Sequence, residues 1–236
     1  MATDLNAPAD TRGMGIVHSA LRRDLERTRM VLGTEPYPDA RRRRAIAAHV
    51  EWMMHFLHVH HNGEDVGLWP LVRAKNPGAG PLLDQMDADH RRIAPAITAL
   101  EDAARAYRDA PEARARLLVA IGELGDVLLP HLRREEREMM PVVAATITDA
   151  EYRAVEQEHF VKPKSFLELG AEGHWIIDGL GPEEREVILH VVPAVPRFIL
   201  LHGFARSYRR QARRRWGTGP AAALPSLTLA RLEGPA

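Results

Sequence analysis

Hydrophobic residues recur at the three- and four-residue spacing of amphipathic α-helices in four successive segments of the chain. The first segment runs from about residue 12 to residue 32, and Gly33 is expected to end it. The second follows the turn TEPYPD, with Asp39 as its N-cap. The third ends near residue 108, and the fourth follows the turn at residues 109–111. Helices of this length joined by short turns predict an all-α protein built on an antiparallel four-helix bundle.

Each of the four apolar stripes includes one histidine, and two of them add a glutamate one helical turn further on. A single histidine in such a stripe is more commonly a packed, hydrogen-bonded core residue. Six polar residues on the inward faces of four consecutive helices instead indicate a cation between them, because unpaired buried carboxylates are costly. The predicted metal ligands are His18, His60, Glu64, His90, His131 and Glu135.

The second and fourth segments share the pattern H-x3-E-[D/E]-x4-P, from His60 to Pro70 and from His131 to Pro141. Residues four apart lie on one helix face, so each copy presents an imidazole and a carboxylate to the same point. That pair of donors suits iron, manganese or zinc. One copy alone would more commonly be a solvated face. A parallel pair, His61 with Asp65, is rotated by roughly 100°, but only the His60 register reproduces the second copy's spacing to proline.

The other charged residues near these motifs are assigned supporting positions. Asp87 lies one turn before His90 and is expected to accept a hydrogen bond from its ring. Pro95 and Pro130 lie inside the third and fourth helices, where each removes a backbone hydrogen bond. The remaining histidines of the second helix are expected to point away from the ligand face, toward the surface or behind the ligands: His49, His55, His58 and His61.

The amino-acid composition excludes several kinds of functional site and partner. The chain has 236 residues, 32 acidic and 32 basic side chains, twelve histidines and no cysteine. The absence of cysteine excludes disulfides, thiolate metal sites, iron–sulfur clusters and cysteine nucleophiles. The balanced charge gives no overall field that would attract nucleic acid or a membrane. No signal peptide is recognisable in the first ten residues, and the apolar run at 187–201 is too interrupted to span a bilayer. The expected location is therefore the cytoplasm.

Residues 12–145 resemble the hemerythrin-like (HHE cation-binding) family of four-helix di-iron proteins. The resemblance is carried by the order His, His-x3-Glu, His, His-x3-Glu, with LWP or MMP after the acidic motifs. It implies that the two glutamates bridge two non-heme irons and the histidines cap them. It also implies an oxygen species between the metals, as an Fe–O–Fe or Fe–OH–Fe centre, with manganese or zinc as substitutes. No catalytic residue is assigned.

The chain departs from the animal oxygen carriers of this family, which have a second histidine four residues from the first in helix three. The corresponding positions here are Met86 and Ala94. Two six-coordinate irons offer about twelve positions. Four histidines, two bridging glutamates and one bridging oxygen fill about ten of them, which leaves about two open or one for an unidentified ligand. Ferritin-like proteins are the competing metal bundle, but the chain has a single Glu-x-x-His string, Glu156 to His159, interpreted as ordinary helix surface.

The domain prediction is a disordered tail at 1–11, the metal-binding bundle at 12–145, a C-terminal helical extension at 146–216 and a disordered tail at 217–236. His174, His190 and His202 have no carboxylate at ligand spacing and are assigned structural roles. The stretch Arg206–Arg215 contains six arginines. It suits nucleic acid, a phosphate or an acidic partner, but the charged face of an amphipathic helix is the favoured interpretation.

Three functions fit these features. The first is a binding protein that takes up O2, NO or peroxide at a di-iron centre for sensing, storage or transport. The second is a di-iron enzyme that activates the same molecules, such as an oxidase, peroxidase or NO-reducing enzyme. The third is an iron-responsive module whose folding is coupled to metal binding. A substrate pocket would separate the second from the first.

Overall fold

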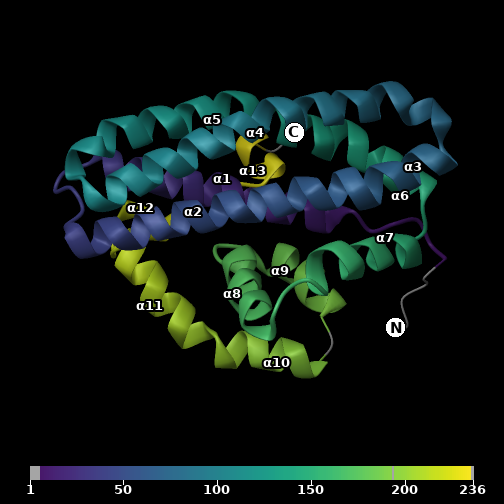
Figure 1. The fold of residues 1–236 in the computed structure, drawn as a ribbon. Coiled ribbons are helices and arrows are strands. Elements are labelled where there is room, and N and C mark those ends of the chain that lie inside the picture. Colours follow the sequence, from purple (N-terminus) through teal and green to yellow (C-terminus); the bar gives the residue numbers. More distant parts are fainter. Residues whose placement is uncertain (1–5, 193, 235–236) are drawn as a thin grey trace.

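The structure, a computed structural model, describes residues 6–192 and 194–234, with a single isolated antiparallel bridge, between Pro8 and Thr148, outside its helices and turns. Four long helices run side by side (Figure 1). Helix α4 packs against α2 and α5, and α5 packs against α1. The predicted all-α bundle is confirmed. Its helices are α1 (Arg12–Gly33), α2 (Ala40–Gly63), α4 (Gly80–Asp109) and α5 (Arg114–Arg134).

Shorter elements extend or connect these helices. α2 continues through a π-helical turn, η1 (Glu64–Leu68), into α3 (Trp69–Lys75). α5 continues in the same way through η4 (Glu135–Met139) into α6 (Met140–Thr146). The 3-10 turns η2 (Pro77–Ala79) and η3 (Pro111–Ala113) precede α4 and α5. Among the described residues, no helix is both long enough and apolar enough to cross a membrane.

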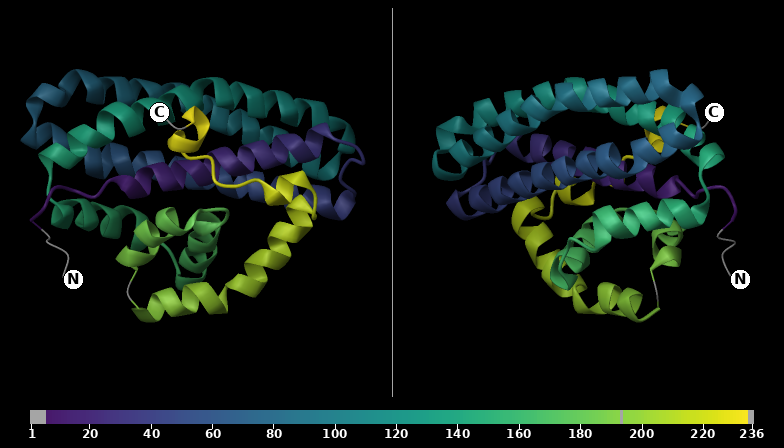
Figure 2. Two further views of the ribbon diagram at one scale, coloured as in Figure 1. Left: turned by 180° about the vertical axis from the view of Figure 1, so that it is seen from behind. Right: turned by 45° about the vertical axis from the view of Figure 1, so that its right-hand side comes forward.

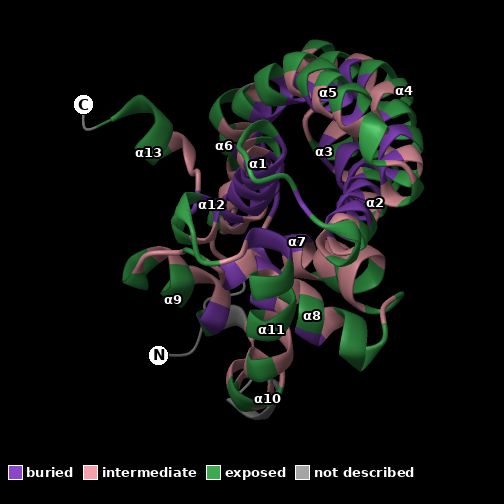
Figure 3. Cartoon of the chain, turned by 90° about the vertical axis from the view of Figure 1, so that its left-hand side faces the viewer, coloured by how far each residue is buried: buried purple, intermediate pink, exposed green. Residues whose placement is uncertain are grey.

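The buried apolar side chains form two clusters, one toward each end of the bundle. Seen end-on, buried residues line the inward faces of the four long helices (Figure 3). On α1, Met14 belongs to one cluster and Leu21 to the other, with His18 between them. On α4, Met86 and Ile93 flank His90 in the same way. The predicted ligands therefore occupy a buried polar layer between two apolar ones.

The C-terminal extension lies along one side of the bundle (Figures 1 and 2). Its helices α8 and α11 pack against α1 and α2. Pro163 lies in the turn between the π-helical turn η5 and α8, where the helix is interrupted. The elements are α7 (Asp149–Glu156), η5 (Gln157–Val161), α8 (Phe166–Ile177), α9 (Pro182–Val191), α10 (Ala194–Gly203), α11 (Ala205–Trp216), α12 (Pro220–Ala223) and α13 (Leu229–Glu233).

A buried carboxylate on α1 holds this extension. Asp24 accepts hydrogen bonds from Arg23 Nε (2.8 Å), His49 Nε2 (2.7 Å) and Trp175 Nε1 (3.0 Å). Burial alone would raise the pKa of Asp24, but Arg23, His49 and Arg27 together hold it well below its ordinary value. His49 is therefore a buried structural residue of α2. Burial and the Arg215 charge lower the pKa of His49 to about 4, so its ring is neutral at pH 7.

The chain ends differ from the disordered tails expected from composition. Near the N-terminus, Ala9 N–H donates to the Ile147 carbonyl at 3.1 Å, and Ala9 is buried. Near the C-terminus, Arg27 Nη2 donates to the Leu224 carbonyl at 2.9 Å. The N–H of Ser226 donates to the Gly179 carbonyl, in the loop between α8 and α9. Figure 2 shows this segment running back along α1. These contacts attach parts of residues 6–11 and 217–234 to the bundle, while the division into tails, bundle and extension stays a prediction; residues 1–5 and 235–236 lie outside the described part.

Candidate metal centre

A π-helical turn begins at the glutamate of each repeated motif. The N–H of Trp69 donates to the Glu64 carbonyl, and the N–H of Met140 donates to the Glu135 carbonyl, five residues back in each case. The next residue is proline in both copies. Proline has no N–H, and its ring clashes with the carbonyl four residues before it, so a regular α-turn cannot continue. The proline in the pattern therefore accounts for the wider turn that starts at each glutamate.

The first group of buried side chains joins α1 to α2. His18 Nε2 and His60 Nε2 lie 3.3 Å apart. Both residues are at most 6% exposed, so solvent does not separate them. Two imidazole nitrogens at this distance are directed at a common region between the helices.

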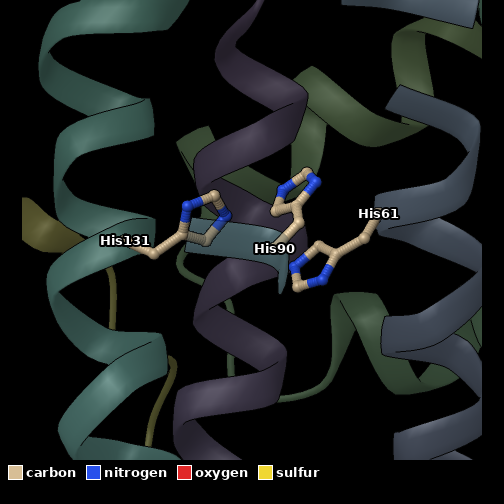
Figure 4. Close-up of side chains that lie close together, drawn as sticks. All are labelled: His61, His90 and His131. Atoms are coloured by element: carbon tan, nitrogen blue, oxygen red, sulfur yellow. The ribbon is translucent and has the colours of Figure 1, made fainter. Parts of the chain in front are cut away.

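The second group contains three histidines, from α2, α4 and α5 (Figure 4). The rings of His61 and His90 stack with centroids 4.1 Å apart, and the His131 ring meets His90 edge-on at 4.7 Å. One ring nitrogen from each residue lies within 4.8 Å of the other two. All three are buried, so three imidazoles converge in a space closed to bulk solvent.

Two fully buried glutamates lie between the histidine groups. Glu64 Oε1 is 3.0 Å from His60 Nε2, and Glu64 Oε2 is 3.6 Å from His90 Nε2. Glu135 Oε2 is 3.5 Å from His18 Nε2 and 3.4 Å from His131 Nε2. Each carboxylate therefore faces a histidine of both groups, which is the placement of a bridging ligand.

The acidic residue that follows each glutamate supports a histidine on a different helix. Asp65 Oδ1 is 2.7 Å from His90 Nδ1, and Glu136 Oε1 is 2.8 Å from His18 Nδ1. A carboxylate at Nδ1 fixes the ring and its tautomer, and leaves Nε2 unprotonated and directed at the centre. The expectation that Asp87 orients His90 is wrong, because Asp87 lies 3.6 Å from Arg73 and Asp65 takes that position.

Burial at this site opposes the charges that its ionisable side chains would carry in water. Burial, reinforced by the charge of Glu135, raises the pKa of Glu64 well above its ordinary value. Burial also lowers the pKa of His60 and His61, and lowers that of His131 to about 2. His60, His61 and His131 are thus neutral, with lone pairs available.

Several polar atoms of these glutamates and histidines have no hydrogen-bond partner within the described residues. Both oxygens of Glu64 and of Glu135 are buried without a hydrogen-bond partner. The Nε2 atoms of His61, His90 and His131 are buried without one as well. Buried polar atoms are normally paired, and a bound ion is a recognised explanation when no protein group pairs with them. Neutral imidazoles around two carboxylates are a donor set that fits divalent iron, manganese or zinc.

The sequence comparison agrees with this geometry. The model of the hemerythrin HHE cation-binding domain matches residues 14–143, and a second match covers residues 84–159. The first match covers more than half of the chain. The chain belongs to this family. Neither the curated proteins nor the solved structures gave a match.

This hemerythrin HHE chain has a candidate ligand that the sequence analysis placed wrongly. His61 was expected at the surface or behind the ligands, but it is 6% exposed and stacks on His90. His55 and His58 are exposed, as expected. The six predicted ligands all lie in the cluster, and His61 adds a seventh donor.

Replacing His61 with alanine tests that seventh position. Partners behind the ligands typically change metal affinity by roughly 10–100-fold, so loss of a direct ligand should exceed that range for one of the two metals. We expect iron content after dialysis to fall from two per chain toward one, with the helical circular dichroism unchanged. His58→Ala, an exposed histidine of the same helix, is the matched control. Retention of two irons by His61→Ala would return His61 to a packing role.

Proposed function

We propose that the chain is a non-heme di-iron protein that binds O2, NO or peroxide at a carboxylate-bridged centre, for sensing, storage or transport. The observation that supports the proposal best is the arrangement of five buried histidines in groups of two and three, with two buried glutamates between them. The proposed ligands are His18, His60, His61, Glu64, His90, His131 and Glu135. Iron bound there would supply an exchangeable coordination position and one-electron redox chemistry.

The two metal positions are unequal in this proposal. With both glutamates bridging, the three-histidine position has five protein ligands and the two-histidine position has four. A metal that prefers six-coordinate geometry is therefore more open beside His18 and His60. His61 removes one of the vacancies counted from the sequence, which makes the centre less open than that count suggested.

The two-histidine side is covered by aromatic rings. The Phe56 ring stacks on His60 with centroids 5.9 Å apart, and the Phe160 ring from η5 lies 5.8 Å from the same histidine. Gly63 permits this cover, because a Cβ there would lie 2.4 Å from the Phe160 ring. An apolar cover disfavours charged ligands, since they would have to shed their hydration. It therefore supports a small, uncharged ligand such as O2 or NO.

The alternative is a di-iron oxidoreductase acting on a separate substrate. Such an enzyme requires a substrate cavity beside the metals. A hollow of about 480 Å³ lies between α2, α8 and α11, and none of the seven proposed ligands lines it. This separation favours the binding protein over the enzyme.

The first experiment is to measure metal content, and then to record optical spectra of the reduced protein before and after adding O2. We expect two irons per chain and an absorption change that reverses when O2 is removed. Irreversible oxidation, or turnover of peroxide or NO, would reassign the chain to the enzymes. One metal or none per chain would contradict the dinuclear centre.

Removing the Phe160 ring should open the two-histidine side. We expect Phe160→Ala to keep two irons and to bind azide about tenfold more tightly, because a charged ligand then avoids a desolvation cost of ~1–3 kcal/mol. Spectral titration with azide measures the change. Phe166→Ala removes an exposed phenylalanine from the same extension and is the control. Equal azide affinity in wild type and Phe160→Ala would show that Phe160 does not cover the open position.

A further inference from the structure

A group of unpaired arginines lies where α11 meets the beginning of α2. Within the described residues, none of these guanidinium groups has a carboxylate within 4 Å, although the chain as a whole is electrically neutral. Several arginines elsewhere are paired, as Arg22 is with Glu136 and Arg27 with Asp178. Like charges gathered together repel one another, and Asp39 is the one carboxylate among the residues that line the two hollows described below. The unpaired arginines are Arg41, Arg42, Arg210, Arg213, Arg214 and Arg215.

The same region is hollowed. The cavity of about 480 Å³ between α2, α8 and α11 adjoins a second hollow of about 390 Å³. Arg210 and Arg214 line both. Alanines on α2 and α8, including Ala48 and Ala171, leave room in the larger cavity, and Trp52 provides an aromatic wall. Ligand sites typically have volumes of about 300–1,000 Å³ and combine apolar walls with a few polar groups.

Arg215 lies in the larger cavity and is 8% exposed. Its Nη1 donates to His49 Nδ1 at 3.1 Å, so its contact there is with a neutral imidazole. Its Nε is buried without a hydrogen-bond partner. An unpaired buried cation is costly, and an anion in the cavity would offset that cost. This buried group is the second observation, beside the exposed arginines, that indicates an anionic ligand.

We propose that this cavity binds a phosphate ester of mononucleotide size that carries a flat ring. Guanidinium groups match phosphate oxygens in a two-pronged geometry, which Arg210, Arg214 and Arg215 are placed to provide. Trp52 and the alanines offer a surface on which a planar ring can lie. A bare phosphate would leave that apolar wall exposed. A long nucleic acid would not need an enclosed cavity, and therefore fits the observations less well.

Titration of the full-length protein with AMP, GMP and FMN tests the proposal. Tryptophan fluorescence reports binding directly because Trp52 and Trp175 line the cavity. We expect at least one ring-bearing phosphate to bind at least tenfold more tightly than adenosine and inorganic phosphate, with affinity falling as salt increases. If none binds more tightly than about 1 mM, or if inorganic phosphate binds equally well, the proposal fails. Binding of a single-stranded RNA without binding of the mononucleotides would assign the surface to nucleic acid instead.

Two double variants on one helix separate a shaped site from general charge. Arg210→Gln with Arg214→Gln removes two lining charges, and we expect it to weaken binding about tenfold or more. Arg206→Gln with Arg209→Gln removes two exposed charges of α11 that line neither hollow, and we expect less than twofold weakening. Equal weakening by both pairs would overturn the site. Circular dichroism and iron content confirm that each variant is folded, and binding failure with intact iron content leaves the di-iron proposal unaffected.

Discussion

Replacing Glu64 or Glu135 with alanine should abolish the dinuclear centre. Each carboxylate faces a histidine of both groups, at 3.0–3.6 Å from their Nε2 atoms. Removing one therefore takes a ligand from each metal position at once, whereas removing a histidine takes a ligand from one. We expect iron content to fall from two per chain to below one in either variant, measured on freshly purified protein. His55→Ala, an exposed position of α2, should keep both irons.

In the metal-free protein, removing the charge of Glu64 should raise the unfolding temperature. Burial disfavours the charged form of Glu64, and no cation offsets it when metal is removed. Glu64→Gln keeps the side chain's volume and removes the charge, so the chelated variant should unfold at a higher temperature than chelated wild type. Added iron should stabilise wild type by mass action and leave the variant nearly unchanged. For the iron-content experiment, two irons per chain in both Glu64→Ala and Glu135→Ala would show that the glutamates do not bridge.

The bundle and the six predicted ligands could be obtained from the sequence because helical periodicity is regular. Residues four apart share a face, and this alone aligns His60 with Glu64 and His131 with Glu135. The repeated proline also helped, because Pro70 and Pro141 follow His60 and His131 at the same spacing and so fix the register of the two motifs. The family match and the helical fold confirm the all-α, hemerythrin-like bundle. The ligand assignments stay predictions until the metal is measured.

His61 was missed because a single ligand face per helix was assumed. His61 and His60 differ by about 100° around α2, which suggested that only one faces inward. The structure shows that both directions are interior: His60 meets α1, while His61 and Asp65 meet His90 of α4. A helix with neighbours on two sides buries an arc wider than its apolar stripe. The adjacent histidines, each with an acidic residue four positions later, were the available signal.

The C-terminal tail was missed for a different reason. Its composition is typical of disorder, and its partners lie far away in the sequence. Arg27 of α1 is charged, yet it is 2% exposed and donates to the Leu224 carbonyl. Contacts between a buried charge and a backbone carbonyl nearly 200 residues away leave no periodic signal. Only the three-dimensional structure reveals them.

Asp24→Ala should be the most destabilising substitution outside the metal centre. Asp24 is fully buried and receives hydrogen bonds from α1, α2 and α8, so it links the bundle to the extension. Alanine leaves Arg23 and Arg27 buried with less compensating charge. Breaking a buried ion pair in this way costs about 3–5 kcal/mol. Urea unfolding of the metal-loaded protein measures the loss of unfolding free energy.

The site of proteolytic cleavage distinguishes loss of the Asp24 contact with the extension from a general loss of charge. Trp175 loses its hydrogen-bond acceptor, so limited proteolysis should cut residues 166–216 earlier in Asp24→Ala than in wild type, while the four long helices stay protected. Glu26→Ala removes a carboxylate of the same helix that pairs with Arg29 at the surface, at 2.8 Å, and should cost less than about 1 kcal/mol. If the two variants lost equal stability, Asp24 would not hold the extension. A large loss together with early cleavage of α8 and α11 means that Asp24 is a principal link between the extension and the bundle.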